Sequence, residues 1–320
     1  MKMKQLKLFV QSRILDWYAS HKRKLPWRET DNPYAILVSE IMLQQTQVDR
    51  VIPKYTAFLQ RFPTPQALAA AQTSDVITLW SGLGYNRRAI ALQKAAQHIC
   101  MKKTFPSTTE ELQTLPGIGP YTARAVLSFA FHKDVPVVDT NIRRIFSRHF
   151  FAGKGTPATI DKKVTALLPL GRSTDWNNAL MDFGSLLCTA NNPQCHSCPL
   201  QKSCTAYKKG TQHTYLKIAP PQPTFIGSRR QHRGIILRIL KEAQDNTASF
   251  VIIQKTLKKP STYVESILND LQKDQLIVRD QALVSLPSSR GTCLAPSKSS
   301  MFYRKRCVPV RDNPPRRAIT

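Results

Sequence analysis

Apolar residues recur at helical spacing from Leu6 to about Tyr207, which leaves few fold classes open to this chain. Glycine and proline interrupt the pattern at short intervals, and convincing strand-like alternation is absent. We therefore expect an all-α architecture for this part. The candidate helices span residues 6–20, 33–46, 51–62, 64–70, 74–79, 86–101, 109–115, 121–131, 140–149, 160–168 and 175–188.

The chain changes in character after residue 207. Residues 208–228 are rich in proline and predict an extended linker. Residues 229–287 contain three short helical stretches followed by an alternating pair, which indicates a small winged-helix-like domain. The stretches span residues 231–243, 249–258 and 261–273, and the pair spans 276–279 and 283–286. Residues 288–320 lack periodicity and are rich in Ser, Pro and Arg, so we predict a disordered basic tail.

The charge is strongly positive, with 47 Lys and Arg against 20 Asp and Glu, or +27 in 320 residues. Both the first 210 residues and the remainder are basic, which favours a polyanionic partner, nucleic acid before an acidic membrane. Apolar runs such as 125–131 are far shorter than the ~20 residues of a membrane span, and the N-terminus does not resemble a signal peptide. We therefore expect a cytoplasmic protein without a membrane partner.

Four of the seven cysteines lie in one short segment, spaced Cys188-x6-Cys195-x2-Cys198-x5-Cys204. An intracellular chain has little use for disulfides, so cysteines this close indicate a metal site. Thiolates suit either zinc or an iron–sulfur cluster, and the residues alone leave that choice open.

The segment LPGIGPYTA, residues 115–123, predicts a turn between two helices, with Gly117 and Gly119 inside it. Glycine permits positive φ and close backbone approach, so successive N–H groups can converge on an anion at a helix N-terminus. Such a helix–hairpin–helix grips a DNA phosphate without recognising sequence. A plain turn is the simpler alternative.

Glu40 falls between Ile36 and Leu43 on one stripe of the helix expected from residue 33. Desolvation among apolar neighbours would raise the pKa of its carboxyl, which would then act as a general acid near neutral pH. A boundary residue whose carboxylate reaches water is the alternative. Taken alone, a glutamate in this position is more often such a boundary residue than a catalytic acid.

Asp139 ends the apolar run 135–138 and precedes a predicted helix, so helix capping is its simplest role. Capping is compatible with catalysis, because the donors that cap a carboxylate also hold it ionised. An ionised carboxylate facing an acid such as Glu40 is the pairing that cleaves glycosidic bonds.

The hairpin, the aspartate twenty residues beyond its second glycine and the cysteine spacing together resemble the helix–hairpin–helix base-excision DNA glycosylases. Four further segments are similar to the adenine DNA glycosylase (MutY) family, which removes adenine mispaired with 8-oxoguanine or guanine. They are LPWR (25–28), SEIMLQQTQV (39–48), WSGLGY (80–85) and VDTN (138–141). The resemblance covers residues 8–207 and implies a two-lobed fold, duplex DNA as partner and a [4Fe–4S] cluster on the four cysteines. It also implies a nucleoid-associated bacterial protein that acts as a monomer.

The resemblance also implies residue roles. Glu40 matches the acid that protonates adenine at N7, and Asp139 the carboxylate that stabilises the oxocarbenium-like sugar. Asn141 matches the amide beside it. Tyr121 stands where bifunctional relatives carry a Schiff-base lysine, which implies base removal without strand cleavage. Four other positions match DNA-contacting residues: Gln45 and Tyr85 those that wedge into the duplex, and Arg28 and Leu43 those of the adenine pocket.

Two departures from the family pattern keep alternatives open. The chain has VDTN where the adenine glycosylases usually have VDGN, and the threonine is common in the endonuclease III branch. Residues 229–287 are also too few for the Nudix-like domain that recognises 8-oxoguanine in typical members. A sibling glycosylase for G:T mispairs or oxidised pyrimidines is therefore one alternative. A non-catalytic iron–sulfur DNA-binding regulator is the other.

Overall fold

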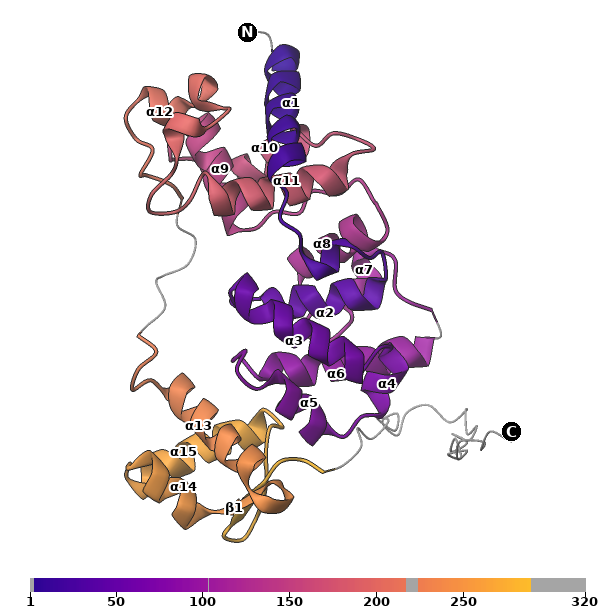
Figure 1. The fold of residues 1–320 in the computed structure, drawn as a ribbon, viewed down its shortest axis with the longest axis vertical. Coiled ribbons are helices and arrows are strands. Elements are labelled where there is room, and N and C mark those ends of the chain that lie inside the picture. Colours follow the sequence, from indigo (N-terminus) through magenta and orange to yellow (C-terminus); the bar gives the residue numbers. More distant parts are fainter. Residues whose placement is uncertain (1–2, 103, 217–223, 289–320) are drawn as a thin grey trace, which may run out of the picture.

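The computed structural model describes residues 3–102, 104–216 and 224–288 (Figure 1). Up to residue 216, the described residues form helices and turns and no strand, as the periodicity predicts. The helices are α1 (Met3–His21), η1 (Pro26–Arg28), α2 (Pro33–Leu43), α3 (Val48–Arg61), α4 (Pro65–Ala70), α5 (Thr73–Trp80), α6 (Arg87–Lys102), α7 (Thr109–Gln113), α8 (Pro120–Ala130), α9 (Thr140–Phe151), α10 (Pro157–Ala166), α11 (Ser173–Leu186), η2 (Cys195–Ser197), η3 (Gln201–Ser203) and α12 (Thr205–Lys208). None of the described helices is long and apolar enough to cross a membrane.

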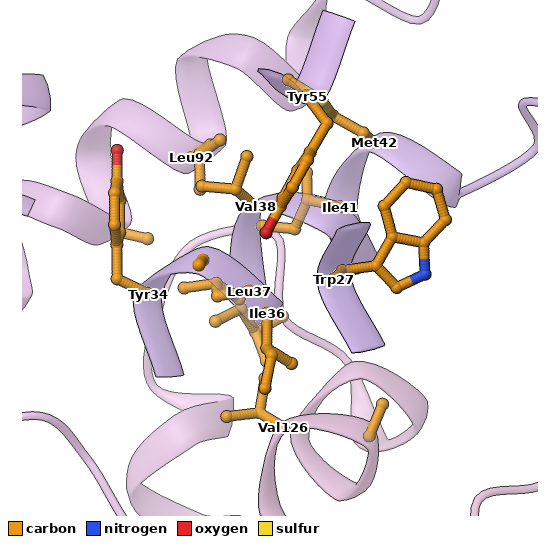
Figure 2. Packing of buried hydrophobic residues seen from close by; sticks show 14 of the residues in the cluster. Trp27, Tyr34, Ile36, Leu37, Val38, Ile41, Met42, Tyr55, Leu92 and Val126 are labelled. Atoms are coloured by element: carbon orange, nitrogen blue, oxygen red, sulfur yellow. The ribbon is translucent and has the colours of Figure 1, made fainter. Parts of the chain in front are cut away.

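The helices form two lobes, each with its own hydrophobic core. The central lobe comprises α2–α8, with α2 at its centre (Figure 2). The terminal lobe packs α1 against α9, α10 and α11, so the first helix of the chain joins helices more than a hundred residues later. Trp80 and Trp176 are fully buried, one in each lobe. The apolar faces predicted from periodicity are therefore buried in two cores.

Helix α2 ends at Leu43, three residues before the end that the sequence predicts. The buried Arg88 on α6 explains this, because its Nη1 donates to the carbonyls of Ile41 and Met42, both at 2.9 Å, and of Gln44 at 2.5 Å. These carbonyls would otherwise lack partners at the helix end. Gln45 then takes a left-handed conformation, with φ 57°, and turns the chain away.

Residues 229–285 form a C-terminal unit of three helices and a small antiparallel sheet. These are α13 (Arg229–Glu242), η4 (Gln244–Asn246), β1 (Thr247–Ser249), α14 (Phe250–Leu257), α15 (Ser261–Lys273), β2 (Val278–Asp280) and β3 (Leu283–Ser285). The sheet order is β1-β3-β2, with Thr247 and Val278 both opposite Ser285. Strand β1 was not predicted, because its three residues are too few to show alternation.

The C-terminal unit packs against α5 and α6 of the central lobe. Ile77 and Ile90 belong to the same apolar cluster as the core of the C-terminal unit. The Ser74 amide donates to the Pro287 carbonyl at 3.0 Å, and Arg87 forms an ion pair with Asp274 at 3.3 Å. Residues 289–320, expected to be a basic tail, and residues 217–223 of the expected linker lie outside the described residues.

Candidate active site

A cleft of about 490 Å³ lies between the two lobes and brings together six of the residues singled out from the sequence. Its walls come from η1, α2, α8, α9 and α11, which belong to both lobes. The six residues are Arg28, Glu40, Leu43, Tyr121, Asp139 and Asn141. We call it the active-site cleft below.

Glu40 is 5% exposed in the active-site cleft. Helix α2 is buried on all sides from Tyr34 to Met42, a more complete enclosure than one apolar stripe implies. Burial, followed by the nearby charge of Asp139, raises the pKa of Glu40 from 4.5 to about 7. A hydrogen bond with Tyr121 and the charge of Arg28 oppose this effect. Glu40 therefore retains a proton near neutral pH, as a general acid must.

Tyr121 lies in the first turn of α8 and donates its hydroxyl to Glu40. Burial first, and then the charges of Glu40 and Asp139, raise the pKa of Tyr121 well above 10. The phenol therefore stays protonated at neutral pH and acts as a donor to the carboxyl. It offers no amine with which a sugar aldehyde could form a Schiff base.

Asp139 is the N-cap of α9, the simpler of its two expected roles. One oxygen accepts from the Ile142 amide at 2.7 Å, and the other from Asn141 Nδ2 at 2.9 Å. Burial raises the pKa of Asp139, while these donors and the charge of Arg144 lower it. The donors act in the direction that capping predicts, but burial outweighs them.

The position of Arg28 depends on Asp182, which the sequence analysis did not single out. Arg28 Nη1 lies 2.8 Å from Asp182 Oδ2, and Nη2 lies 3.0 Å from Oδ1. Arg23 binds the same carboxylate through its backbone amide and Nε, at 3.0 and 2.7 Å. The Asp182 side chain is fully buried. The sequence did contain a signal of this burial, because Asp182 lies inside an apolar helix stripe, one residue before Phe183.

The hairpin joins α7 to α8 as predicted, and its two glycines differ in backbone conformation. Gly117 has φ +80°, and a Cβ there would lie 2.8 Å from the Ala91 methyl carbon. Gly119 has φ −92° and is the N-cap of α8, with Pro120 at the first helical position. Glycine is therefore required at 117 by both φ and space. At 119 it leaves open space before the helix N-terminus.

Gln45 and Tyr85 do not line the active-site cleft. They line a second cleft of about 1330 Å³, between the turn after α5 and helix α13. Tyr85 has φ 49°, so both residues occupy left-handed conformations that are uncommon outside glycine. The Tyr85 hydroxyl accepts from Arg230 Nη1 at 2.9 Å. The structure thus separates the two expected wedge residues from the six in the active-site cleft.

The four cysteines line one apolar pocket with the side chains of α9. Burial, with the charges of the neighbouring sulfurs, raises the pKa of Cys198 to about 12, so its thiol would not ionise without a bound cation. No described group of three or more His, Cys, Asp or Glu side chains converges on a single metal ion. Arg148 also lines this pocket, with Nη1 3.4 Å from Cys188 Sγ. Four sulfurs around a common apolar space, beside a buried cation, form a donor set suited to an anionic iron–sulfur cluster.

Arg144 connects this pocket to the active-site cleft, and nothing in the sequence singled it out beyond its basic character. Its Nε donates to the Cys188 carbonyl at 2.8 Å, and Nη2 donates to Asn141 Oδ1 at 2.9 Å. Asn141 in turn donates to Asp139. The same guanidinium also binds the Gly184 carbonyl at 2.7 Å. One continuous set of hydrogen bonds therefore joins the cysteine segment to the capping carboxylate.

Comparison with known proteins agrees with this architecture. Residues 38–170 match the model of the HhH-GPD superfamily base excision DNA repair proteins. A thermostable thymine-DNA glycosylase structure is 28% identical, with a TM-score of 0.62 over 65% of this chain and all of that one. A non-covalent endonuclease III–DNA complex shares the fold at 24% identity and a TM-score of 0.58, over 66% of this chain and all of that one. The fold and cleft define a helix–hairpin–helix glycosylase of base-excision DNA repair.

Sequence relatives narrow the class. Adenine DNA glycosylase of Mycobacterium tuberculosis (strain H37Rv) is 42% identical over 241 residues, which cover 72% of this chain and 78% of the relative. The human adenine DNA glycosylase is 39% identical over 63% of this chain and 40% of its own length. This chain belongs to the adenine DNA glycosylase family.

Proposed function

We propose that this protein is a monofunctional DNA glycosylase that removes adenine mispaired with 8-oxoguanine or guanine during base-excision repair. One observation carries the proposal. Glu40, a buried carboxyl with a pKa of about 7, lies in the same cleft as Asp139, whose charge contributes to that pKa. Asp139 differs from Glu40 in accepting two hydrogen bonds that favour its charged form. Two carboxyl groups in such different environments serve as the acid and the charge stabiliser of glycosidic cleavage.

The reaction begins when adenine leaves the base stack, at a cost of a few kcal/mol that is lowest for a mispaired base. Glu40 donates its proton to N7 of the adenine, so the N9–C1′ bond breaks with its electron pair on the base. The Asp139 carboxylate stabilises the cation left on the sugar, and Asn141 holds that carboxylate in place. Water then adds at C1′ and gives a proton to the Glu40 carboxylate, which completes the hydrolysis and restores the acid.

Tyr121 supports the monofunctional assignment. Its protonated hydroxyl donates to Glu40, and a phenol cannot form the Schiff base that precedes strand cleavage. The abasic strand should therefore remain intact until alkali is added. Leu43 and Arg28 would line the pocket for the extruded adenine, with Arg28 fixed by Asp182.

Duplex DNA would bind through its phosphates. The hairpin offers backbone N–H groups at the N-terminus of α8, and Gly119 leaves open space before them. This contact fixes the register of the protein on the duplex without recognising bases. The excess of basic residues would likewise contact phosphates independently of the base sequence. Gln45 and Tyr85 would enter the duplex beside the base opposite the adenine.

The four cysteines would hold a [4Fe–4S] cluster, and the apolar pocket, which Arg148 also lines, suits that group. A bound cluster would supply four cross-links to residues 188–204, which carry no other regular structure than η2 and η3. The chain's own contribution is Arg144, which ties this segment to Asn141. We assign the cluster a structural role.

We further propose the domain organisation expected from the sequence: a glycosylase domain over residues 1–207, a linker over 208–228, a winged-helix-like domain over 229–287 and a basic tail over 288–320. Three helices with a β1-β3-β2 sheet support the winged-helix assignment. Tyr215 lies near Arg144 and Arg148, so the start of the linker segment packs on α9.

The test is single-turnover base release from duplexes with A opposite 8-oxoguanine, G, C or T. Duplexes with T opposite G, and with thymine glycol opposite A, complete the set. We expect breaks at A:8-oxoguanine and A:G only after alkali. Release only from the T:G or thymine glycol duplex would replace this proposal with the sibling activity. No release from any duplex, with the cluster bound, would favour the DNA-binding regulator.

The matched variants are Glu40→Gln and Glu110→Gln. Glu40→Gln keeps the side-chain size but removes the proton donor, so base release should fall at least about 10²-fold while duplex binding persists. Glu110 is exposed on α7, and its variant should behave as wild type. Normal turnover by Glu40→Gln would exclude Glu40 as the acid.

A further inference from the structure

The second cleft has a strongly basic lining that the proposed catalytic steps do not use. One wall is the segment from Ser81 to Arg88 together with Gln44 and Gln45, and the other is helix α13. Eight basic side chains line it against two acidic ones, Asp270 and Asp274. The basic residues are Arg50, Arg87, Arg88, Arg230, Arg233, Arg238, Lys241 and Lys273.

Both acidic groups are already engaged within the protein. Asp270 lies 2.7 Å from Arg229, and Asp274 lies 2.5 Å from Arg233. Arg238 and Lys241, by contrast, are exposed and form no ion pair with any described residue. The cleft therefore has positive charge in excess of what the described side chains neutralise. An anionic occupant would relieve this excess.

Two arginines lie on one face of α13, and a glycine, Gly234, lies between them. Arg230, Gly234 and Arg238 follow at intervals of four, which places them one above another on the helix. Gly234 is exposed, and a Cβ there would meet nothing within 4 Å. Packing therefore does not explain a glycine that costs helix stability. Open backbone between two arginines permits close approach of an extended ligand.

The two clefts lie on opposite sides of one short segment. Leu43, Thr46 and Val48 line the active-site cleft, whereas Gln44 and Gln45 line the second. A nucleotide extruded into the active-site cleft would therefore leave its partner strand on the side of the second cleft. Tyr85, held by Arg230, stands on the same side.

We propose that the second cleft binds the sugar–phosphate backbone of the DNA strand opposite the adenine, with α13 as its outer wall. The inference rests on the proposed function, because it takes duplex DNA with an extruded adenine as the substrate. Arg238 and Lys241 contact phosphates, Gly234 lets the strand approach the helix, and Arg230 positions Tyr85. The C-terminal unit thereby completes the DNA-binding surface and holds the opposite base beside Gln45 and Tyr85.

A further observation supports an anionic occupant. Burial, and next the charge of Lys241, lowers the pKa of Lys54, which lies behind the turn at Gly82. Like charges from the central lobe and from α13 thus act on each other beside the second cleft. A phosphate placed between them would convert this repulsion into attraction.

The experiment compares two double variants with the same change in charge. Arg238→Ala/Lys241→Ala removes two cations from the cleft. Lys255→Ala/Lys259→Ala removes two from exposed positions of the same unit outside the cleft. The full-length protein is titrated with an A:8-oxoguanine duplex across a salt series. We expect the cleft variant to bind about tenfold more weakly and its salt slope to fall by about 2, while the control matches wild type.

Gly234→Leu separates a binding role from a structural one. Leucine favours helix over glycine, so the melting temperature should hold or rise, yet the side chain would obstruct the cleft and weaken duplex binding. In single-turnover assays, Gly234→Leu should mainly raise the enzyme concentration that gives the half-maximal rate. Duplex binding equal to wild type in Gly234→Leu and in the cleft double variant would overturn the inference.

Neutral methylphosphonate linkages identify the strand. Placed around the base opposite the adenine, they should abolish the difference between wild type and the cleft variant. Placed in the adenine strand, they should leave that difference intact. The reverse result would assign the cleft to the adenine strand and overturn the proposal. Failure of the proposed function is distinguishable from either strand assignment, because the wild-type protein itself would then release no adenine.

Discussion

Arg28 and Asp182 form a bidentate ion pair between the two lobes, with N–O distances of 2.8 and 3.0 Å. Planar guanidinium–carboxylate pairs of this geometry fix orientation as well as charge. The Asp182 carboxylate is fully buried, whereas Arg28 reaches into the active-site cleft. The pair therefore joins the terminal lobe to a side chain that faces the proposed adenine pocket.

Asp182→Asn should destabilise the protein by roughly 3 kcal/mol, because it leaves two arginines facing a neutral side chain in a buried site. Base release should fall as well, since Arg28 loses its fixed orientation. Urea unfolding and single-turnover assays measure the two effects. Asp161→Asn, which disrupts a more exposed pair with Arg143, is the control and should cost less than about 1 kcal/mol. Equal losses in the two variants would contradict the special position of Asp182.

Glu40 should make stability depend on pH between about 4.5 and 7. Its folded pKa of about 7 exceeds the unfolded value, so the folded state retains a proton that the unfolded state has lost. Stability should therefore fall as pH rises through this window, by up to roughly 3 kcal/mol. Glu40→Gln should lose this dependence and be more stable than wild type at pH 8. Urea unfolding from pH 5 to 8 provides the measurement, and identical slopes for the two proteins would refute the assignment.

Gly117→Ala and Gly119→Ala should differ sharply. At 117 a methyl group meets both a left-handed backbone and the Ala91 side chain, so we expect a loss of about 2 kcal/mol and weaker duplex binding. At 119 the backbone is extended and the space is open, so the folding cost should stay within about 0.5 kcal/mol. Thermal unfolding and duplex titration test the pair. Similar stability of both variants would contradict the hairpin geometry described here.

Cys198→Ser should remove the visible absorbance expected from the proposed cluster, because it would delete one of the four proposed ligands. Hydrogen exchange of residues 188–207 should then rise, since little regular structure holds that segment. Cys100→Ser is the matched control, because Cys100 lies on α6, away from the cysteine pocket. Retained colour and exchange protection in Cys198→Ser would exclude it as a ligand.

Most helices were predictable because their signals are local. The N-cap role of Asp139 and the glycine-containing hairpin depend on residues a few positions apart. The predicted end of α2 was wrong by three residues, because Arg88, more than forty positions away, binds its last carbonyls. Strand β1 was missed because its three residues owe their conformation to pairing with β3. The apolar stripe around Asp182 indicates its burial, but its partners Arg23 and Arg28 are distant in sequence and were not predictable. The same holds for the Cys188 carbonyl that Arg144 binds.

The sequence by itself determined the helical architecture, the cysteine spacing and the carboxylates available for chemistry, because periodicity, ligand spacing and capping act over a few residues. The tertiary structure decided which of these groups meet. The pKa of Glu40 depends on burial between lobes and on the charge of Asp139, and the second cleft exists only because α13 packs beside the turn after α5. The apolar stripe around Glu40 indicates desolvation, but its full burial and the charge of Asp139, far along the chain, are properties of the folded interior that no local pattern encodes.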